Sequence, residues 1–296
     1  MKRLLRMKIA MLGLGLLTIY PQSVMAQGNN FLTNSILMQD TNIDKSYIKL
    51  QFLHPEYKTY DWGSSYTQDI ASKSGSYNLM GSFPMGENSA IQVTLPYHRI
   101  KETFSIEGFG ESITDKRSES GIGNIKLNVV KKLSRSYVGW RHYTSIGVNL
   151  PTASEEAPEG ALDNYYDIFS YLDEGVALHG SILNVKRSEN MSLSIEFGPD
   201  FWIPTGDNSA KNEFLAHYGI GLAFTPMTNL SVRGEWVGLG IVSESADFVC
   251  KWQHQLAIGA RLQVGRLAPG FFWMKNMNDL DDVYDSAVGF ELGFDL

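Results

Sequence analysis

The chain has 296 residues, 43% of them hydrophobic and 12% aromatic, and a formal net charge of −7. The first 26 residues hold four of the 25 basic residues and none of the 32 acidic ones, which leaves a net charge of −11 for the remainder. This acidic balance argues against a nucleic-acid partner, because binding phosphates requires a basic face. The single cysteine, Cys250, excludes an intramolecular disulfide framework.

The N-terminal stretch has the three parts of a secretory signal. Four basic residues precede an apolar run over 9–19, and a small residue, Ala26, follows soon after. The run is too short to span a bilayer as a helix, so we predict a signal peptide over 1–26 that is cleaved after Ala26. An uncleaved anchor is the alternative. Residues 27–45 carry no clear pattern; we expect a periplasmic N-terminal segment there, with a short plug or an extra strand as alternatives.

From residue 46 onward the hydrophobic pattern has a period of two. In 191–197, for example, apolar side chains at odd positions alternate with Ser192, Ser194 and Glu196. Strict alternation predicts strands with one apolar and one polar face. We predict twelve strands, near 46–53, 74–83, 89–107, 120–133, 136–150, 171–186, 190–204, 213–225, 228–242, 248–264, 267–275 and 284–296.

The expected connections alternate in length. Every second one is long or polar, beginning with 54–73 and 108–119, whereas those between are tight, as at 85–88 and 265–266. This alternation favours an all-β fold, an antiparallel up-and-down transmembrane β-barrel over 46–296 with about 12 strands and both termini periplasmic. A soluble β-sandwich also alternates and is the competing fold. Pro96 and Pro199 fall inside expected strands, where either could mark a bulge.

The polar face of such a barrel points into the lumen, because a charged side chain in hydrocarbon costs about 2–4 kcal/mol at midplane. We predict that Arg233, Glu235, Glu196 and Arg261 form a network across the barrel. It could set selectivity or simply fill a narrow lumen. The predicted lumen-lining residues are Lys49, Gln51, Lys126, Asn128, Glu196, Arg233, Glu235, Arg261 and Glu291. Aromatic residues near the strand ends, Tyr47 and Trp236 among them, are expected in interfacial girdles.

One pair of residues raises a catalytic alternative. His179 and Ser181 lie two residues apart on an expected strand, so both point to one face, as in outer-membrane lipid hydrolases that use a His-x-Ser pair. The alternation puts them on the lumen face, however, whereas a lipid hydrolase needs the lipid face. We therefore expect a protein that is not an enzyme, with no catalytic residues, no metal site and no cofactor.

Two sets of short motifs carry a family resemblance. Ser120-Gly121-Ile122-Gly123-Asn124-Ile125 opens an expected strand and Lys131-Lys132-Leu133 closes it, while Leu150-Pro151-Thr152 and Ile203-Pro204-Thr205-Gly206-Asp207 end two others. Over about 45–296 the chain resembles the putative outer-membrane transporters of the phenol-degradation meta-pathway (MetA-like) family, which usually has Asp where Asn124 stands. The resemblance implies a barrel of about twelve strands that passes small molecules, such as aromatic ones.

Two functions from different classes follow as hypotheses. The first is a passive, porin-like channel for a small solute, such as an aromatic or hydrophobic one, in the outer membrane of a Gram-negative cell. The second is a structural or surface-binding barrel with a filled lumen, whose outer loops meet a partner. In both, the expected partners are outer-membrane lipid and the barrel assembly machinery.

Overall fold

The computed structural model describes residues 35–56, 60–61, 66–72, 74–108, 111–133, 139–154, 165–172, 174–206, 211–243, 252–278 and 286–296. The predicted signal peptide, its cleavage site and residues 27–34 lie outside this part of the chain. Within the described ranges, no helix has the length and apolar character needed to cross a bilayer.

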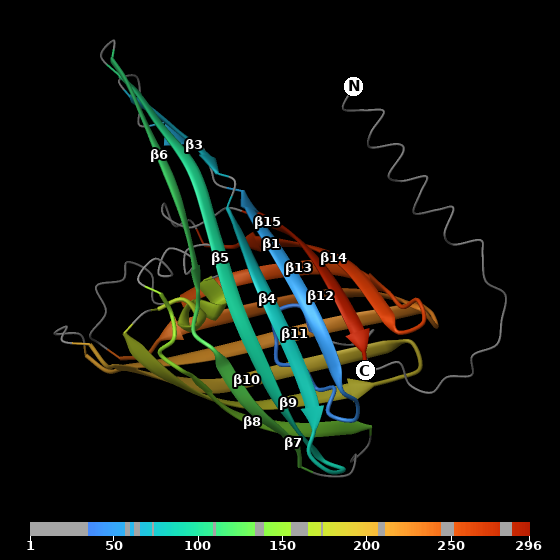
Figure 1. The fold of residues 1–296 in the computed structure, drawn as a ribbon. Helices are drawn as coiled ribbons and strands as arrows, with labels where there is room; N and C mark the ends of the chain where they lie inside the picture. The colour runs from blue at the N-terminus through green and yellow to red at the C-terminus, as the bar shows by residue number, and fades with distance from the viewer. Residues whose placement is uncertain are drawn as a thin grey trace.

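Twelve of the described strands form a closed antiparallel ring (Figure 1). Most are paired with their neighbours in the chain, β15 pairs with β1, and the ring closes where β5 pairs with β7 over Ser89–Thr94. This confirms the predicted antiparallel β-barrel of twelve strands. The ring strands are β1 (Tyr47–Glu56), β4 (Gly75–Pro84), β5 (Ser89–Gly108), β7 (Lys126–Lys132), β8 (Trp140–Asn149), β9 (Gly175–Arg187), β10 (Met191–Pro204), β11 (Glu213–Met227), β12 (Leu230–Ile241), β13 (Trp252–Leu262), β14 (Leu267–Asn276) and β15 (Ser286–Asp295).

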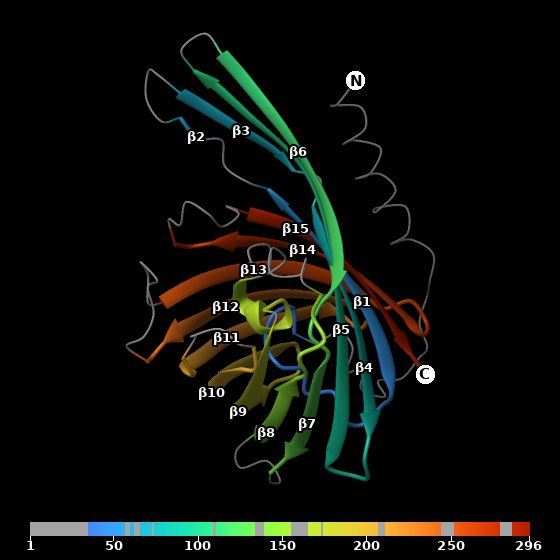
Figure 2. The same cartoon turned by 60° about the vertical axis from the view of Figure 1, so that its left-hand side comes forward.

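Three further strands lie outside the ring. β6 (Glu111–Ile122) and β3 (Tyr66–Ser72) pair with the two edges of the second half of β5, and the short β2 (Tyr60–Asp61) pairs with β3. They form a sheet that extends away from the barrel (Figures 1 and 2). The sequence analysis expected only connections over 54–73 and 108–119, and these ranges contain β2, β3 and most of β6.

The expected strand 120–133 is divided where this extension leaves the ring. β7 pairs with β5 up to Thr94, and β6 pairs with it from Tyr97 onward. Pro96 lies between the two, and its carbonyl accepts a hydrogen bond of 2.9 Å from the N–H of Gly123. In an antiparallel strand the N–H and the C=O of a residue face the same neighbouring strand. The N–H that Pro96 lacks would therefore point to the place where β7 has ended as the partner of β5 and β6 has not yet begun. No bulge is needed there, since the β4–β5 register continues through Pro96.

Pro199 has a similar place in β10. The β9–β10 ladder lacks pairs at Gly198 and Pro199 but resumes in the same register at Asp200. The β10–β11 ladder runs through Pro199 without a shift. Both prolines thus interrupt one ladder without bulging the strand.

The outer and inner faces of the barrel wall differ in polarity, as the alternating pattern predicted. On the outside, Ile146, Phe197 and Phe271 are 73%, 60% and 57% exposed. On the inside, Lys49 and Glu196 are only 1% and 4% exposed. A closed barrel with an apolar outer face and a polar inner face has the arrangement of a barrel that crosses a membrane.

The tight connections lie at one end of the barrel. Gly86 and Gly265 have positive φ values of 78° and 61° in the turns after β4 and β13, a backbone conformation that suits glycine. The C-terminus is at this same end, because the N–H of Asp295 donates to the carbonyl of Arg266 at 3.0 Å (Figure 1). β1 starts beside it, with Tyr47 opposite Asp295.

Candidate functional site

The structure describes residues 35–45 of the N-terminal segment, and most of them lie inside the ring. Ser35, Ile36, Met38 and Asp40 are all at least nine-tenths buried. The structure therefore places this part of the segment in the lumen, where the sequence analysis expected a periplasmic segment and kept a plug as an alternative. We refer to residues 35–45 as the plug.

Glu235 of β12 is the main anchor of the plug. Its carboxylate accepts hydrogen bonds from three consecutive backbone N–H groups, those of Ile36 at 2.8 Å, Leu37 at 2.7 Å and Met38 at 3.1 Å. Arg233 donates to the same carboxylate and, through Nη2, to the Ser35 hydroxyl at 3.1 Å. Hydrogen bonds from N–H groups to a buried carboxylate are charge-assisted and stronger than neutral ones.

Gln39 connects the plug to the opposite wall. Its N–H donates to Glu196 of β10 at 2.9 Å, and its side-chain oxygen accepts from Asn128 of β7 at 3.3 Å. Its side-chain nitrogen donates to Gln92 of β5. The plug is thereby attached across the full width of the lumen.

Asp40 fixes the end of the plug that leads into β1. Its carboxylate accepts from the Tyr47 hydroxyl at 2.9 Å and from Lys49 Nζ at 3.1 Å, and both partners are buried. Gln51, the next inward residue of β1, donates to the carbonyl of Ile36 at 3.3 Å. The expectation of Tyr47 in an interfacial girdle was wrong, because its ring lies inside the barrel.

A second segment enters the lumen from the other end. The 3-10 helix η2 (Tyr165–Ser170) belongs to the connection between β8 and β9, and Asn124 holds it in place. Asn124 Nδ2 donates to the carbonyls of Phe169 at 2.9 Å and Leu172 at 2.5 Å, while its Oδ1 accepts from the N–H of Thr152 at 2.9 Å. One amide thus ties both halves of this connection to the point where β6 and β7 separate. We refer to residues 165–172 as the cap.

The cap packs on an apolar layer inside the barrel. Phe169 is 4% exposed and shares a buried cluster with Leu215, Leu239, Phe272 and Met274, which come from three different strands. Lys126 of β7 pairs with Asp167 at 3.4 Å on the other side of the cap. Because this layer lies within the wall, the lumen has an apolar zone as well as a polar one.

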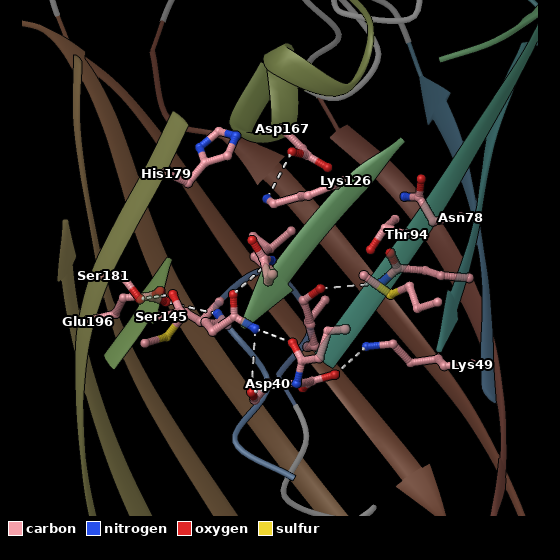
Figure 3. A pocket seen from close by; sticks show the side chains of 18 of the residues that line it. Asp40, Lys49, Asn78, Thr94, Lys126, Ser145, Asp167, His179, Ser181 and Glu196 are labelled. Atoms are coloured by element: carbon pink, nitrogen blue, oxygen red, sulfur yellow. Dashed lines mark hydrogen bonds and ion pairs between the residues drawn. The ribbon is translucent and has the colours of Figure 1, made fainter. Parts of the chain in front are cut away.

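A cavity of about 130 Å³ remains between the plug and the cap (Figure 3). Lys126, Asp167 and His179 lie around its upper part, and Asp40 and Lys49 lie at its base. Polar side chains line much of it, whereas Leu53, Leu239, Phe272 and Met274 give it an apolar side.

Two histidines and two acidic residues form a cluster on one wall of this cavity. The oxygens of Asp200 lie 2.6 Å from Nδ1 of His179 and 2.6 Å from Nδ1 of His217. Nε2 of His217 is 3.9 Å from Glu196, and Nε2 of His179 is 2.6 Å from Asn149 Oδ1. The sequence analysis missed Asp200 and His217, although both occupy inward positions of their strands.

The structure buries eight of the nine predicted lumen residues, and Lys126 is partly buried. It does not arrange Arg233, Glu235, Glu196 and Arg261 as expected, by direct contact across the barrel. Arg233 pairs with Glu235, Arg261 pairs with Glu291 at 2.5 Å, and Glu196 and Glu235 are linked through the backbone of the plug. The network therefore runs through the plug.

The pair required by the catalytic alternative has other partners. The hydroxyl of Ser181 lies 2.8 Å from that of Ser145, and the ring nitrogens of His179 face Asp200 and Asn149. In this arrangement the imidazole is engaged elsewhere and is not placed to take a proton from Ser181.

Comparison with known proteins shows that the chain shares its fold with solved outer-membrane barrels. An outer-membrane channel from Pseudomonas putida F1 is 10% identical, with a TM-score of 0.60 over 88% of this chain and 100% of that chain. The NanC porin is 6% identical, with a TM-score of 0.54 over 84% of this chain and 100% of that chain. No protein-family model matches the sequence, and no curated protein matches it. At these identities the likeness shows the fold, an outer-membrane β-barrel.

Proposed function

We propose that this protein is an outer-membrane channel through which a small solute diffuses, and that the plug closes its lumen at rest. One observation carries the proposal. The plug is held by hydrogen bonds to side chains of the wall, whereas the strand pairs that close the ring all begin at Tyr47 or later. A segment attached in this way can leave the lumen by local opening, without breaking the barrel.

The proposal includes a route to the membrane. Residues 1–26 act as a signal peptide that is removed after Ala26, and the barrel assembly machinery then inserts the mature chain. Outer-membrane lipid contacts the apolar outer face, for which exposed residues such as Ile146 and Phe271 provide the surface. No nucleic acid takes part, and diffusion through a lumen requires no cofactor.

The solute is a small molecule with aromatic or hydrophobic character. Two observations support this. The chain resembles the phenol-degradation meta-pathway family in its Ser120–Ile125 and Leu150–Thr152 motifs, and the cavity has an apolar side formed by residues such as Leu239 and Phe272. We assign no catalytic role to His179 and Ser181, because their side chains are engaged with other partners.

A structural or surface-binding barrel is the second candidate. The observation in its favour is that the plug and the cap occupy the lumen from both ends and leave only about 130 Å³ between them. In that case the filling stiffens the barrel and the outer loops bind a partner. The two candidate functions differ in whether the plug leaves the lumen.

Conductance of a chain that lacks residues 27–45 separates them. Full-length and shortened proteins are refolded and inserted into planar bilayers, and heat-dependent migration in gels verifies that both fold. We expect brief or rare openings of the full-length protein and a lasting increase in conductance for the shortened one. If the shortened, folded barrel conducts no better than the full-length protein, and neither releases small solutes from liposomes, the channel proposal is wrong.

A further inference from the structure

We infer that the cavity between the plug and the cap binds a small solute that carries an ammonium group on a short apolar stem. This inference rests on the proposed channel function and names the class of solute that the same lumen accepts. Three features of the cavity lead to it: the charge of its lining, the acceptors that face it, and its apolar side.

The first feature is an excess of negative charge. Four carboxylates line the cavity, and two of them are matched by lysines, Asp40 by Lys49 at 3.1 Å and Asp167 by Lys126 at 3.4 Å. Among the described residues, no lysine or arginine forms an ion pair with Glu196 or Asp200, which face the imidazoles of His179 and His217 instead. A cavity lined in this way favours cations over anions, because its low-dielectric walls concentrate the field.

The second feature is unused acceptor capacity. A carboxylate can accept about four hydrogen bonds, and Glu196 receives one from the N–H of Gln39 and one from the Ser181 hydroxyl. On a different strand, Asn78 lines the same cavity with a side chain only 5% exposed, and its Oδ1 has no hydrogen-bond partner within the described part of the chain (Figure 3). A buried acceptor without a donor is unfavourable, so a ligand N–H that reaches it is stabilised.

These acceptors also reject the opposite charge. A solute carboxylate placed near Glu196 would meet like charge, and near Asn78 Oδ1 it would meet a second acceptor. An ammonium group, which offers three donors and no acceptor, suits both positions.

The third feature, the apolar side of the cavity, determines the character of the rest of the solute. Leu53, Leu239, Phe272 and Met274 line the cavity from other strands than Glu196. Burying apolar surface against them is favourable at about 25 cal/mol per Å². A short alkyl or aryl stem therefore fits beside the ammonium group, whereas a solute polar over its whole surface gains nothing there.

Calorimetric titration of the folded full-length protein tests the inference with two matched probes. These are n-butylammonium and n-butyrate, which have similar stems and opposite charges. We expect butylammonium to bind and butyrate to give no binding heat. Glu196→Gln keeps an oxygen for the N–H of Gln39 but removes the charge, and should weaken butylammonium binding about tenfold or more. Glu189→Gln, in the exposed turn between β9 and β10, should leave the affinity unchanged.

A second variant covers the case in which Glu196→Gln fails to fold. Asn78→Ala removes the unpartnered acceptor and should weaken butylammonium binding severalfold. The inference is overturned if butyrate binds as tightly as butylammonium, if neither binds, or if both folded variants retain the original affinity. Since binding is measured apart from conductance, a protein that binds butylammonium but never conducts contradicts the channel proposal alone, and one that conducts without binding it contradicts this inference alone.

Discussion

The two segments that fill the lumen are attached in different ways. The plug is bound through its backbone N–H groups to the carboxylates of Glu235 and Glu196, and Ile36 also packs in the buried cluster that contains Phe169. The cap is bound by the amide of Asn124 and by the apolar packing of Phe169, and it is tethered to the wall at both ends. Water can replace the hydrogen bonds of the plug to carboxylates, and the strand pairs of the ring begin only at Tyr47, after the plug. We therefore propose the plug as the part that moves and the cap, which lies between β8 and β9, as the part that stays.

The strongest test of this difference is to remove the apolar attachment of the cap. Phe169→Ala should lower the local stability of the cap by about 3–5 kcal/mol, the usual cost of truncating a buried phenylalanine. Hydrogen exchange of the amides in 165–172 should accelerate, while those of residues 36–38 in the plug should keep their protection. Phe271→Ala is the matched control, because Phe271 faces outward and is 57% exposed. Equal acceleration in plug and cap would mean that the two segments open as one unit.

The polar attachment of the plug is tested by Glu235→Gln, which keeps the shape of the side chain and removes its charge. Hydrogen bonds to a charged group contribute about 1.5–3 kcal/mol, so the open fraction in single-channel records should rise roughly tenfold to a hundredfold. The cap amides should exchange as before. Glu87→Gln, in the exposed turn after β4, is the control and should leave gating unaltered. An unchanged open fraction would show that Glu235 does not hold the plug.

The smallest effect is expected at Asn124, the polar attachment of the cap. Asn124→Asp retains the acceptor for the N–H of Thr152 but loses the donors to the carbonyls of Phe169 and Leu172. We expect a loss of about 1–2 kcal/mol in the local stability of the cap, read from hydrogen exchange at 169–172. Asn124→Gln is a useful comparison, since it keeps the amide donor but places it at the wrong distance on a longer side chain. If Asn124→Asp leaves exchange at 169–172 unchanged, the apolar layer alone holds the cap.

The ring could be predicted from the sequence because each strand separates lipid from lumen. The expected strand 190–204 differs from β10, Met191–Pro204, by one residue. The same reasoning missed β6, whose sequence over Glu111–Ile122 is rich in charged and hydroxyl side chains. That strand lies outside the ring of twelve strands, so the separation of lipid from lumen requires no apolar alternation of it (Figure 2).

Only some of the groups that fill the lumen could be predicted from the sequence. Tyr47 has the same parity in β1 as Lys49 and Gln51, and Asp200 the same parity in β10 as Glu196, so strand alternation could have placed both inside. The plug could not be predicted in this way. Its contacts with Glu235 and Glu196 are made by backbone N–H groups, which every residue except proline carries, so these contacts leave no mark in residue type.

Locking the plug to the wall tests the central claim most directly. A Cβ built on Gly219 of β11 would lie 2.8 Å from Cγ of Met38, and a disulfide needs about 3 Å between one sulfur and the opposite Cβ. Met38→Cys with Gly219→Cys, in a chain carrying Cys250→Ser, should therefore form a disulfide between plug and wall. We predict that the oxidised protein does not conduct and that a reductant restores the openings of the single variants. If fully oxidised and fully reduced proteins give the same conductance, the plug does not gate the lumen.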